Sequence, residues 1–204
     1  MSAVSPEPSR PSAGPPPDAE PPPGAGGLDF DTVYDDHFDF VWRNMGRLGV
    51  EPSAVEDAAQ DVFVVALRRL ADFEGRSAIR TWLFGIALRV AHDYRRAARR
   101  RRDHGIVAED EGDTAAVADE EAPSPLESAT RTEAVVRLHA ILAELDEDRR
   151  AVFILAEMEQ MSAPEIAEAV GANLNTVYTR LRAARREFNE SVARLRARDA
   201  WRQP

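Results

Sequence analysis

Several residue types that carry chemistry in other proteins are missing from this chain or are rare in it. None of its 204 residues is cysteine, which excludes disulfides, zinc ribbons and thiol catalysis. Its four histidines are scattered and lack the spacing of metal ligands. No apolar run approaches the roughly 20 residues of a membrane span, and the N-terminus has no apolar signal core. We therefore expect a soluble, cytoplasmic chain with no metal, no cofactor and no stable membrane insertion.

Lysine is absent too, so all 26 basic residues are arginine, against 36 acidic residues and a net charge of −10. The charge is distributed unevenly. Residues 1–27 carry −2, residues 28–102 carry +1, residues 103–130 carry −9, and residues 131–204 carry no net charge. The negative net charge therefore comes from residues 1–27 and 103–130. The net charge of the whole chain does not argue against a nucleic-acid partner for the other two segments.

Composition divides the chain into the same four parts. Residues 1–27 hold nine prolines and little that is apolar, which predicts a disordered tail. Residues 103–130 hold nine acids and no base, which predicts a flexible linker. Residues 28–102 and 131–204 have helical periodicity. The sequence therefore predicts an all-α protein of two small helical domains.

Apolar periodicity and capping patterns place the individual helices. Ser53 with Glu56, and Thr130 with Glu133, have the spacing of capping boxes, in which the two side chains satisfy free backbone donors at a helix start. The expected helices cover residues 31–45, 53–70 and 78–102 in the first domain, and begin at Thr130 and at residue 146 in the second.

The most specific pattern runs from Ser162 to Phe188. Ser162 with Glu165 forms a third capping box, which starts a short helix. Gly171 suits the left-handed residue that ends such a helix, and Asn173 is a good N-cap for the next one. Two short helices joined by a tight turn predict a helix-turn-helix.

The second of these helices has two distinct faces. Its apolar residues recur at helical spacing and predict one buried face: Val177, Leu181, Ala184 and Phe188. The opposite face carries Asn175, Thr179, Arg182 and Arg186, flanked by Tyr178 and Arg185. Arginine pairs with guanine and asparagine with adenine in the major groove, and further arginines hold phosphates. A solvated amphipathic helix would share this stripe, but the paired caps favour a DNA-reading helix.

The helix expected over 53–70 also has two faces. Its apolar face carries Val55, Ala59, Val62, Ala66 and Leu70, and its other side carries Asp57, Gln60, Asp61, Val64 and Arg68. An exposed valine among acids suggests a docking surface. A plain surface with one stray valine is the alternative.

A loop from Phe73 leads into the helix expected over 78–102. One face of this helix carries Ile79, Leu83, Ile86, Val90 and Tyr94. Six arginines follow between positions 95 and 102. Trp82 lies near the edge of the apolar face, where we expect core packing rather than contact with a base.

Two segments resemble the extracytoplasmic-function group of the sigma-70 family. VEDAAQDVFVVALRRL followed by FEGRSAIRTWLFGIALRVAHDYRR is similar to the family's region 2, and LDEDRRAVFILAEMEQMSAPEIAEAVGANLNTVYTRLRAARREF to its region 4. The two matches lie in the family's order with a linker between them. A linker in place of region 3 is typical of this group.

The resemblance implies a function and a set of sites. Such factors bind core RNA polymerase, direct it to promoters and open the DNA there to start transcription. Docking on the β′ clamp helices is implied for Asp57, Gln60, Asp61, Phe63 and Val64. Binding of the −10 element is implied for Phe73, Glu74, Gly75, Arg76, Ser77, Trp82, Arg89, Arg95 and Arg96. Reading of the −35 element is implied for Asn173, Asn175, Thr176, Tyr178, Thr179, Arg182, Arg185 and Arg186. The β flap of the polymerase and an anti-sigma factor are further implied partners.

Some positions depart from the family pattern. Many members carry asparagine at Arg89, Leu-Pro at Leu145-Asp146, Gly-Thr-Val at residues 175–177, and lysine at Tyr178. Because two of these departures open the reading helix, the resemblance implies no particular promoter sequence.

Two other functions are alternatives to this one. A helix-turn-helix regulator with an N-terminal sensing or dimerisation domain would not need the 53–70 helix and the loop that follows it. An enzyme is disfavoured, because no Ser/His/Asp set, phosphate loop or metal cluster is present. The cluster of Asp35, Asp36, His37 and Asp39 could suggest a metal site. It lies on one predicted helix, however, where adjacent residues point apart, and this disfavours such a site.

Overall fold

The computed structural model describes residues 28–104 and 125–202, and every regular element within them is helical. The elements are α1 (Phe30–Arg47), η1 (Pro52–Ala54), α2 (Val55–Arg69), η2 (Leu70–Asp72), α3 (Ile79–Asp103), α4 (Pro125–Glu144), α5 (Glu147–Phe153), the π-helical turn η3 (Ile154–Met158), α6 (Ala163–Val170) and α7 (Leu174–Arg202). The all-α prediction is confirmed. The predicted tail over 1–27 and residues 105–124 of the predicted linker lie outside the described residues.

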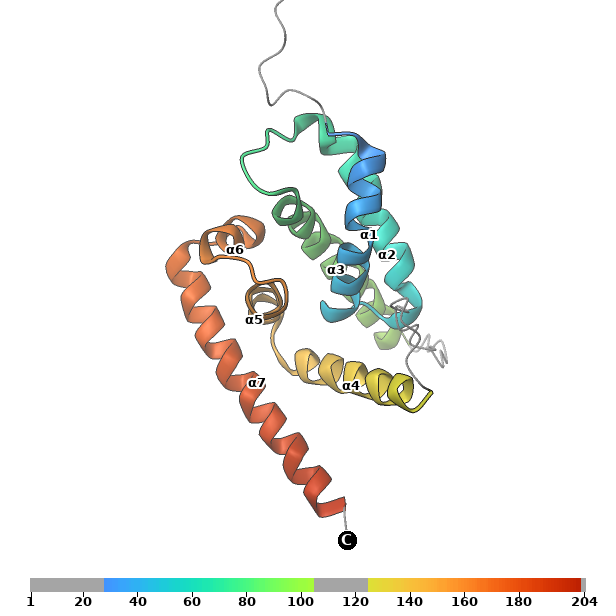
Figure 1. Cartoon of the computed structure of the whole chain (residues 1–204), viewed down its shortest axis with the longest axis vertical. Helices are drawn as coiled ribbons and strands as arrows, with labels where there is room; N and C mark the ends of the chain where they lie inside the picture. Colours follow the sequence, from blue (N-terminus) through green and yellow to red (C-terminus); the bar gives the residue numbers. More distant parts are fainter. Residues whose placement is uncertain (1–27, 105–124, 203–204) are drawn as a thin grey trace, which may run out of the picture.

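The first domain packs α1, α2 and α3 side by side (Figure 1). The apolar stripe predicted for α2 is buried, since Val62 and Ala66 are fully covered. They meet Val41 and Met45 of α1 and Phe84 of α3 in one core. The first domain is therefore a three-helix bundle held by side chains at helical spacing.

The second domain packs α5, α6 and α7 against one another, with α4 against α7. Leu142 of α4, Leu155 after α5, Ile166 of α6 and Val177 of α7 are buried together. The first half of α7 packs on α5 and α6, and its second half passes α4 and continues away from it towards the C-terminus (Figure 1). The helix-turn-helix α6–α7 thus stands on a core built by α4 and α5.

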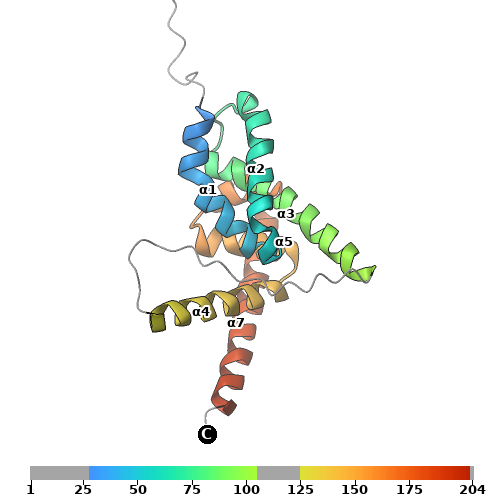
Figure 2. The same cartoon turned by 90° about the vertical axis from the view of Figure 1, so that its right-hand side faces the viewer.

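The two domains also contact each other. Helix α6 lies against α3, and α4 lies near α1, as both views show (Figures 1 and 2). The buried side chains of the two domains form one continuous cluster. The domains are joined by packing as well as by the intervening chain.

Two helix starts differ from the expectation. Ser53 lies in the 3₁₀ turn η1, and α2 begins at Val55 with no side-chain cap, because Pro52 at the front of that turn shapes the chain first. Helix α4 begins at Pro125 rather than Thr130. Proline suits the first helical position, where its missing N–H costs nothing. The last residues of the segment predicted as linker, 125–130, are therefore helical.

Candidate polymerase and nucleic-acid surfaces

The turn of the helix-turn-helix is built by the predicted residues. The Glu165 carboxylate accepts the Ser162 backbone N–H at 2.8 Å and its hydroxyl at 2.6 Å. These hydrogen bonds lower the pKa of Glu165. Gly171 has a left-handed φ of 65°, and Asn173 Oδ1 accepts the Thr176 N–H at 2.9 Å. The capping box, the glycine turn and the second cap are confirmed, and they fix the angle at which α7 leaves α6.

Helix α7 presents the predicted polar face to solvent. Val177, Leu181 and Ala184 are buried, while Tyr178 is 58% exposed. Arg182 is exposed and has no ion pair within the described residues. Its neighbours are partly engaged, because Arg185 pairs with Glu157 at 2.7 Å and Arg186 lies 3.9 Å from Glu190. Asn173, Asn175 and Thr179 are exposed too, with Thr176 partly so.

The outward face of α2 combines acids with exposed apolar side chains. Asp57, Gln60 and Asp61 are exposed, and Val64 is 44% exposed. Leu67 is 56% exposed beside them and was not among the predicted docking residues. Leu67 could have been predicted from the sequence, because it lies three residues after Val64 and residues i and i+3 share a helix face.

Phe63 does not share that face. It is 2% exposed, and its ring lies 4.8 Å from that of Tyr34 and 6.0 Å from that of Phe38. Phe30 completes this aromatic cluster between α1 and α2. Phe63 was expected on the docking face by resemblance, but the structure buries its ring beneath α2, where it supports that face from within.

Asp61 is tied to α3 by a hydrogen bond. The Tyr94 hydroxyl donates to the Asp61 carboxylate at 2.7 Å. Burial of the phenol, together with the Asp61 and Asp57 carboxylates, raises the pKa of Tyr94 to about 12. Tyr94 therefore remains a donor at neutral pH and fixes the Asp61 side chain. Sequence reasoning placed Tyr94 on the apolar face and gave no sign of this contact.

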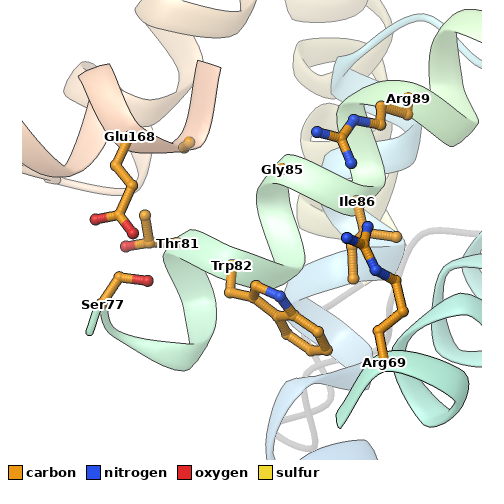
Figure 3. Close-up of a pocket in the computed structure, with 9 residues that line it drawn as sticks. Arg69, Ser77, Thr81, Trp82, Gly85, Ile86, Arg89 and Glu168 are labelled. Atoms are coloured by element: carbon orange, nitrogen blue, oxygen red, sulfur yellow. The ribbon is translucent and has the colours of Figure 1, made fainter. Parts of the chain in front are cut away.

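The loop before α3 leads into a cavity of about 160 Å³. Figure 3 shows Trp82 on α3 with Arg69 and Arg89 to one side of it, and Ser77, Thr81 and Glu168 to the other. The Thr81 hydroxyl is buried without a hydrogen-bond partner in the described part of the chain. Of the predicted loop residues, Phe73 packs on Trp82 at 5.2 Å between ring centroids, and Arg76 pairs with Glu74. Gly75 has a left-handed φ of 66°.

The predicted arginines of α3 differ in their surroundings. Arg89 and Arg96 are exposed and lack ion pairs within the described residues. The Arg95 side chain is 11% exposed and pairs with Glu147 of α5 at 2.9 Å. It also donates to the Leu48 carbonyl. Burial lowers the pKa of Arg95, although its guanidinium stays charged at neutral pH.

Comparison with known proteins identifies both domains. Residues 33–101 match the family model for sigma-70 region 2, and residues 136–188 match that for sigma-70 region 4. The RNA polymerase sigma factor YlaC of Bacillus subtilis is 33% identical, over 80% of this chain and 89% of YlaC. The ECF RNA polymerase sigma factor SigX of the same species is 31% identical, over 74% of this chain and 76% of SigX.

Solved structures have the same fold. A structure of CnrH in complex with the cytosolic domain of CnrY superposes with a TM-score of 0.59 at 25% identity, over 80% of this chain and 87% of that one. A sigma factor RpoE from Bartonella quintana, in complex with the anti-sigma factor NepR, gives a TM-score of 0.60 at 22% identity, over 81% and 97%.

These matches decide between the alternatives for the first domain. A match to region 2 is inconsistent with a sensing or dimerisation domain. No helix of the described residues is both long and apolar enough to cross a membrane. The two region matches in this order, with relatives covered over most of their length, place the chain in the extracytoplasmic-function group of the sigma-70 family, whose members bind core RNA polymerase and direct transcription initiation at promoters.

Proposed function

We propose that three surfaces of the chain divide the work of initiation. The outward face of α2 docks on the β′ clamp helices, the 73–78 loop with α3 holds the opened −10 strand, and α7 reads the −35 duplex. In this proposal the polymerase performs the chemistry and the chain has no catalytic role. It acts where the polymerase acts, in the cytoplasm.

The observation that carries the proposal is the surface of α2. Val64 and Leu67 are exposed side by side, bordered by the carboxylates of Asp57 and Asp61. Apolar side chains at the centre of a patch with a charged rim are typical of a protein docking surface. The hydrogen bond from Tyr94 holds the Asp61 carboxylate in one position before docking. A fixed side chain loses less entropy on binding.

A single strand is best held by the cavity beside Trp82. An indole next to the guanidiniums of Arg69 and Arg89, which have no ion pair in the described ranges of the chain, offers stacking for a base and charge for a phosphate. Capturing a base offsets the few kcal/mol that unstacking it costs, so the DNA opens without ATP hydrolysis. Arg69 was not among the predicted residues, and its place on the cavity wall supports adding it to this surface.

Duplex recognition is supported by the open face of α7. Asn175, Thr179 and Arg182 project from one side of a helix whose other side is buried. An amide, a hydroxyl and a guanidinium are the groups that read base edges in the major groove. Arg185 and Arg186 flank this face, where phosphates run. An anti-sigma factor is a further partner, because a related sigma factor was solved in complex with the anti-sigma factor NepR.

Run-off transcription tests the proposal. Core polymerase is incubated with fragments of genomic DNA, with and without the purified chain, and the transcripts are mapped. We expect transcripts that require the chain and that share two conserved upstream elements. Arg182→Ala is expected to reduce transcription at these promoters without reducing the amount of chain bound to core polymerase. Transcripts that are the same without the chain would contradict the proposal.

A further inference from the structure

The first two turns of α7 expose two large apolar side chains. Leu174 is 44% exposed and Tyr178 is 58% exposed, whereas Val177 between them is fully buried. Residues four positions apart lie one above the other on the same face of a helix. At a rise of about 1.5 Å per residue, the two side chains start about 6 Å apart along the helix axis. Leu174 and Tyr178 therefore form a short apolar strip at the N-terminal end of α7.

The hydroxyl groups of the same turns are used within the helix. Thr176 Oγ1 donates to Asn173 Oδ1 at 3.0 Å, and the same oxygen accepts the Thr176 backbone N–H at 2.9 Å. Thr179 Oγ1 donates to the Asn175 carbonyl at 2.8 Å. A hydroxyl has a single hydrogen to donate, so neither threonine has one left for a base edge. The N-terminal turns of α7 thus offer apolar contact more than hydroxyl donors.

An apolar strip at this end of a recognition helix fits one feature of duplex DNA. The N-terminal residues of such a helix are the ones that reach base edges in the major groove. The apolar group that a base pair presents in that groove is the 5-methyl group of thymine. Phosphates, by contrast, are contacted by charged and polar groups, and the strip carries only the Tyr178 hydroxyl at its tip. The chemistry of the strip therefore matches thymine better than the DNA backbone.

The strip is continuous with the polar groups proposed to read the −35 duplex. Asn175 follows Leu174 directly, Arg182 lies one turn beyond Tyr178, and both polar side chains are exposed. Further along the same side of the helix, Arg185 pairs with Glu157 at 2.7 Å, which ends the apolar surface there. A partner that covered the strip would also cover Asn175 and Arg182. The apolar and polar groups therefore face one occupant, and amide and guanidinium groups favour DNA as that occupant.

We infer that Leu174 and Tyr178 read the methyl groups of thymines in the −35 duplex. The inference rests on the proposed −35 role of α7 and adds a base to it, because the element must then hold thymine where it faces the strip. Base pairs are about 3.4 Å apart, so the spacing of the two side chains corresponds to about two steps. Burying one methyl group against an apolar side chain should strengthen binding about fourfold.

Deoxyuridine tests this contact, because it lacks only the 5-methyl group of thymidine and still pairs with adenine. The probe is a fluorescein-labelled duplex fragment of a promoter mapped by run-off transcription, bound by the full chain in complex with core polymerase. Each thymine of its −35 element is replaced in turn by deoxyuridine. We expect the dissociation constant to rise about fourfold at one thymine or at two neighbouring ones. Replacement of thymines outside the −35 and −10 elements should leave it unchanged.

Three variants connect the effect of deoxyuridine to the strip. The double variant Leu174→Ala/Tyr178→Ala should bind the thymine and deoxyuridine fragments equally, and alanine keeps the helix intact. Tyr178→Phe removes only the hydroxyl and should keep the sensitivity of the parent. Trp201→Ala is the matched control, since it removes a 91% exposed aromatic side chain at the far end of the same helix. It should bind both fragments as the parent does.

Several results would overturn the inference. One is a set of mapped promoters whose −35 elements hold no thymine, and another is equal binding of thymine and deoxyuridine fragments by the parent. Loss of the sensitivity in Tyr178→Phe would mean that the contact depends on the hydroxyl and is not apolar. A complete absence of chain-dependent transcripts would contradict the proposed function and this inference together. Chain-dependent binding that is indifferent to deoxyuridine overturns this inference alone.

Discussion

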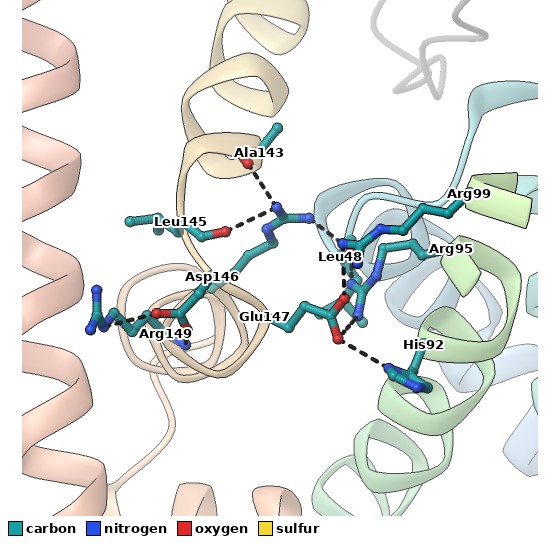
Figure 4. A network of polar contacts seen from close by, with 10 residues as sticks. Leu48, His92, Arg95, Arg99, Ala143, Leu145, Asp146, Glu147 and Arg149 are labelled. Carbon is teal, nitrogen blue, oxygen red and sulfur yellow. Dashed lines mark hydrogen bonds and ion pairs between the residues drawn. The ribbon is translucent and has the colours of Figure 1, made fainter. Parts of the chain in front are cut away.

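Helices α3 and α7 both carry arginines proposed to meet DNA, yet the two sets lie in different surroundings. Arg182 of α7 is exposed and unpaired within the described residues, whereas the Arg95 side chain of α3 is 11% exposed and bound to Glu147. The reading face of α7 is open to solvent, whereas α3 carries exposed arginines, Arg89 and Arg96, beside others that pair with Glu147 (Figure 4) or Glu159. Whether an arginine can contact DNA therefore depends on its ion pairs within the chain as well as on its residue type.

The same contrast separates two faces of region 2. The outward face of α2 exposes Val64 and Leu67, while α3 lies beneath α6. Region 2 therefore has one face that is open to a partner and another that packs against region 4.

The largest effect is expected at the open face of α2. Asp61→Arg combined with Val64→Glu reverses the charge beside Tyr94 and places a carboxylate at the apolar centre. A like-charge or desolvated contact costs several kcal/mol, so core polymerase should bind about 100-fold more weakly. Affinity is measured by fluorescence anisotropy of labelled chain against purified core. Asp31→Arg, an exposed charge reversal on α1, is the control and should bind normally. Equal affinities of the two variants would place the docking surface elsewhere.

A smaller effect is expected on the reading face of α7. Arg182→Ala should weaken binding to duplex −35 DNA by about 1–3 kcal/mol and relax base preference at one position. The matched control is Arg196→Ala on the same helix, which is exposed but lies beyond the helix-turn-helix. Competition binding with a panel of single-base substitutions measures both properties. If Arg182→Ala weakens every sequence equally, Arg182 contacts phosphate rather than a base.

Local features of the fold could be predicted from the sequence, but contacts between distant residues could not. The caps at Ser162 and Asn173 and the turn at Gly171 are local signals, and each is found in the structure. The contact of Arg47 with Glu159 spans 112 residues, and no local pattern encodes such a pairing. At Ser53 a local capping pattern was present, but the preceding proline imposed a 3₁₀ turn.

The exposed face of α2 was predicted from the sequence and the wall of the cavity was not, for a similar reason. The exposed face of α2 follows from helical spacing, which places Asp57, Gln60 and Val64 outside the core. Phe63 was added by resemblance and lies inside, against Tyr34. The cavity wall needs Arg69 from the end of α2 and Glu168 from α6, and only the tertiary structure brings those two helices to α3.

A modest effect is expected from the hydrogen bond beneath the α2 face. Tyr94→Phe removes the donor to Asp61 and should weaken core binding by about 0.5–1.5 kcal/mol, the usual net value of one hydrogen bond. Absorbance of tyrosinate gives an independent readout. Because the folded pKa of Tyr94 is raised to about 12, its contribution to stability is complete below pH 10 and is lost as pH rises through 12. One tyrosine should titrate near pH 12 in the parent and be missing from Tyr94→Phe. Ordinary titration of all tyrosines in the parent would contradict this bond.

The smallest effect concerns the contact of Glu147 on α5 with α3. Burial opposes ionisation of Glu147, but the His92 hydrogen bond and the Arg95 and Arg99 charges outweigh it and lower the pKa of Glu147. A lowered pKa means that this carboxylate stabilises the folded structure at pH values above its ordinary pKa of 4.5 and ceases to do so as pH falls through the lowered pKa. The side chain is 34% exposed, so its share is below about 1 kcal/mol.

Urea unfolding of the full chain, measured from pH 7 to pH 3, detects this share. Stability should fall towards the acid end, and Glu147→Gln should be less stable than the parent at pH 7 and should change less with pH. Glu159→Gln lacks the other carboxylate between the two regions but keeps Glu147, so its stability should still respond to acid. An identical acid response in the parent and in Glu147→Gln would mean that another group governs the loss of stability, with Glu147 contributing little.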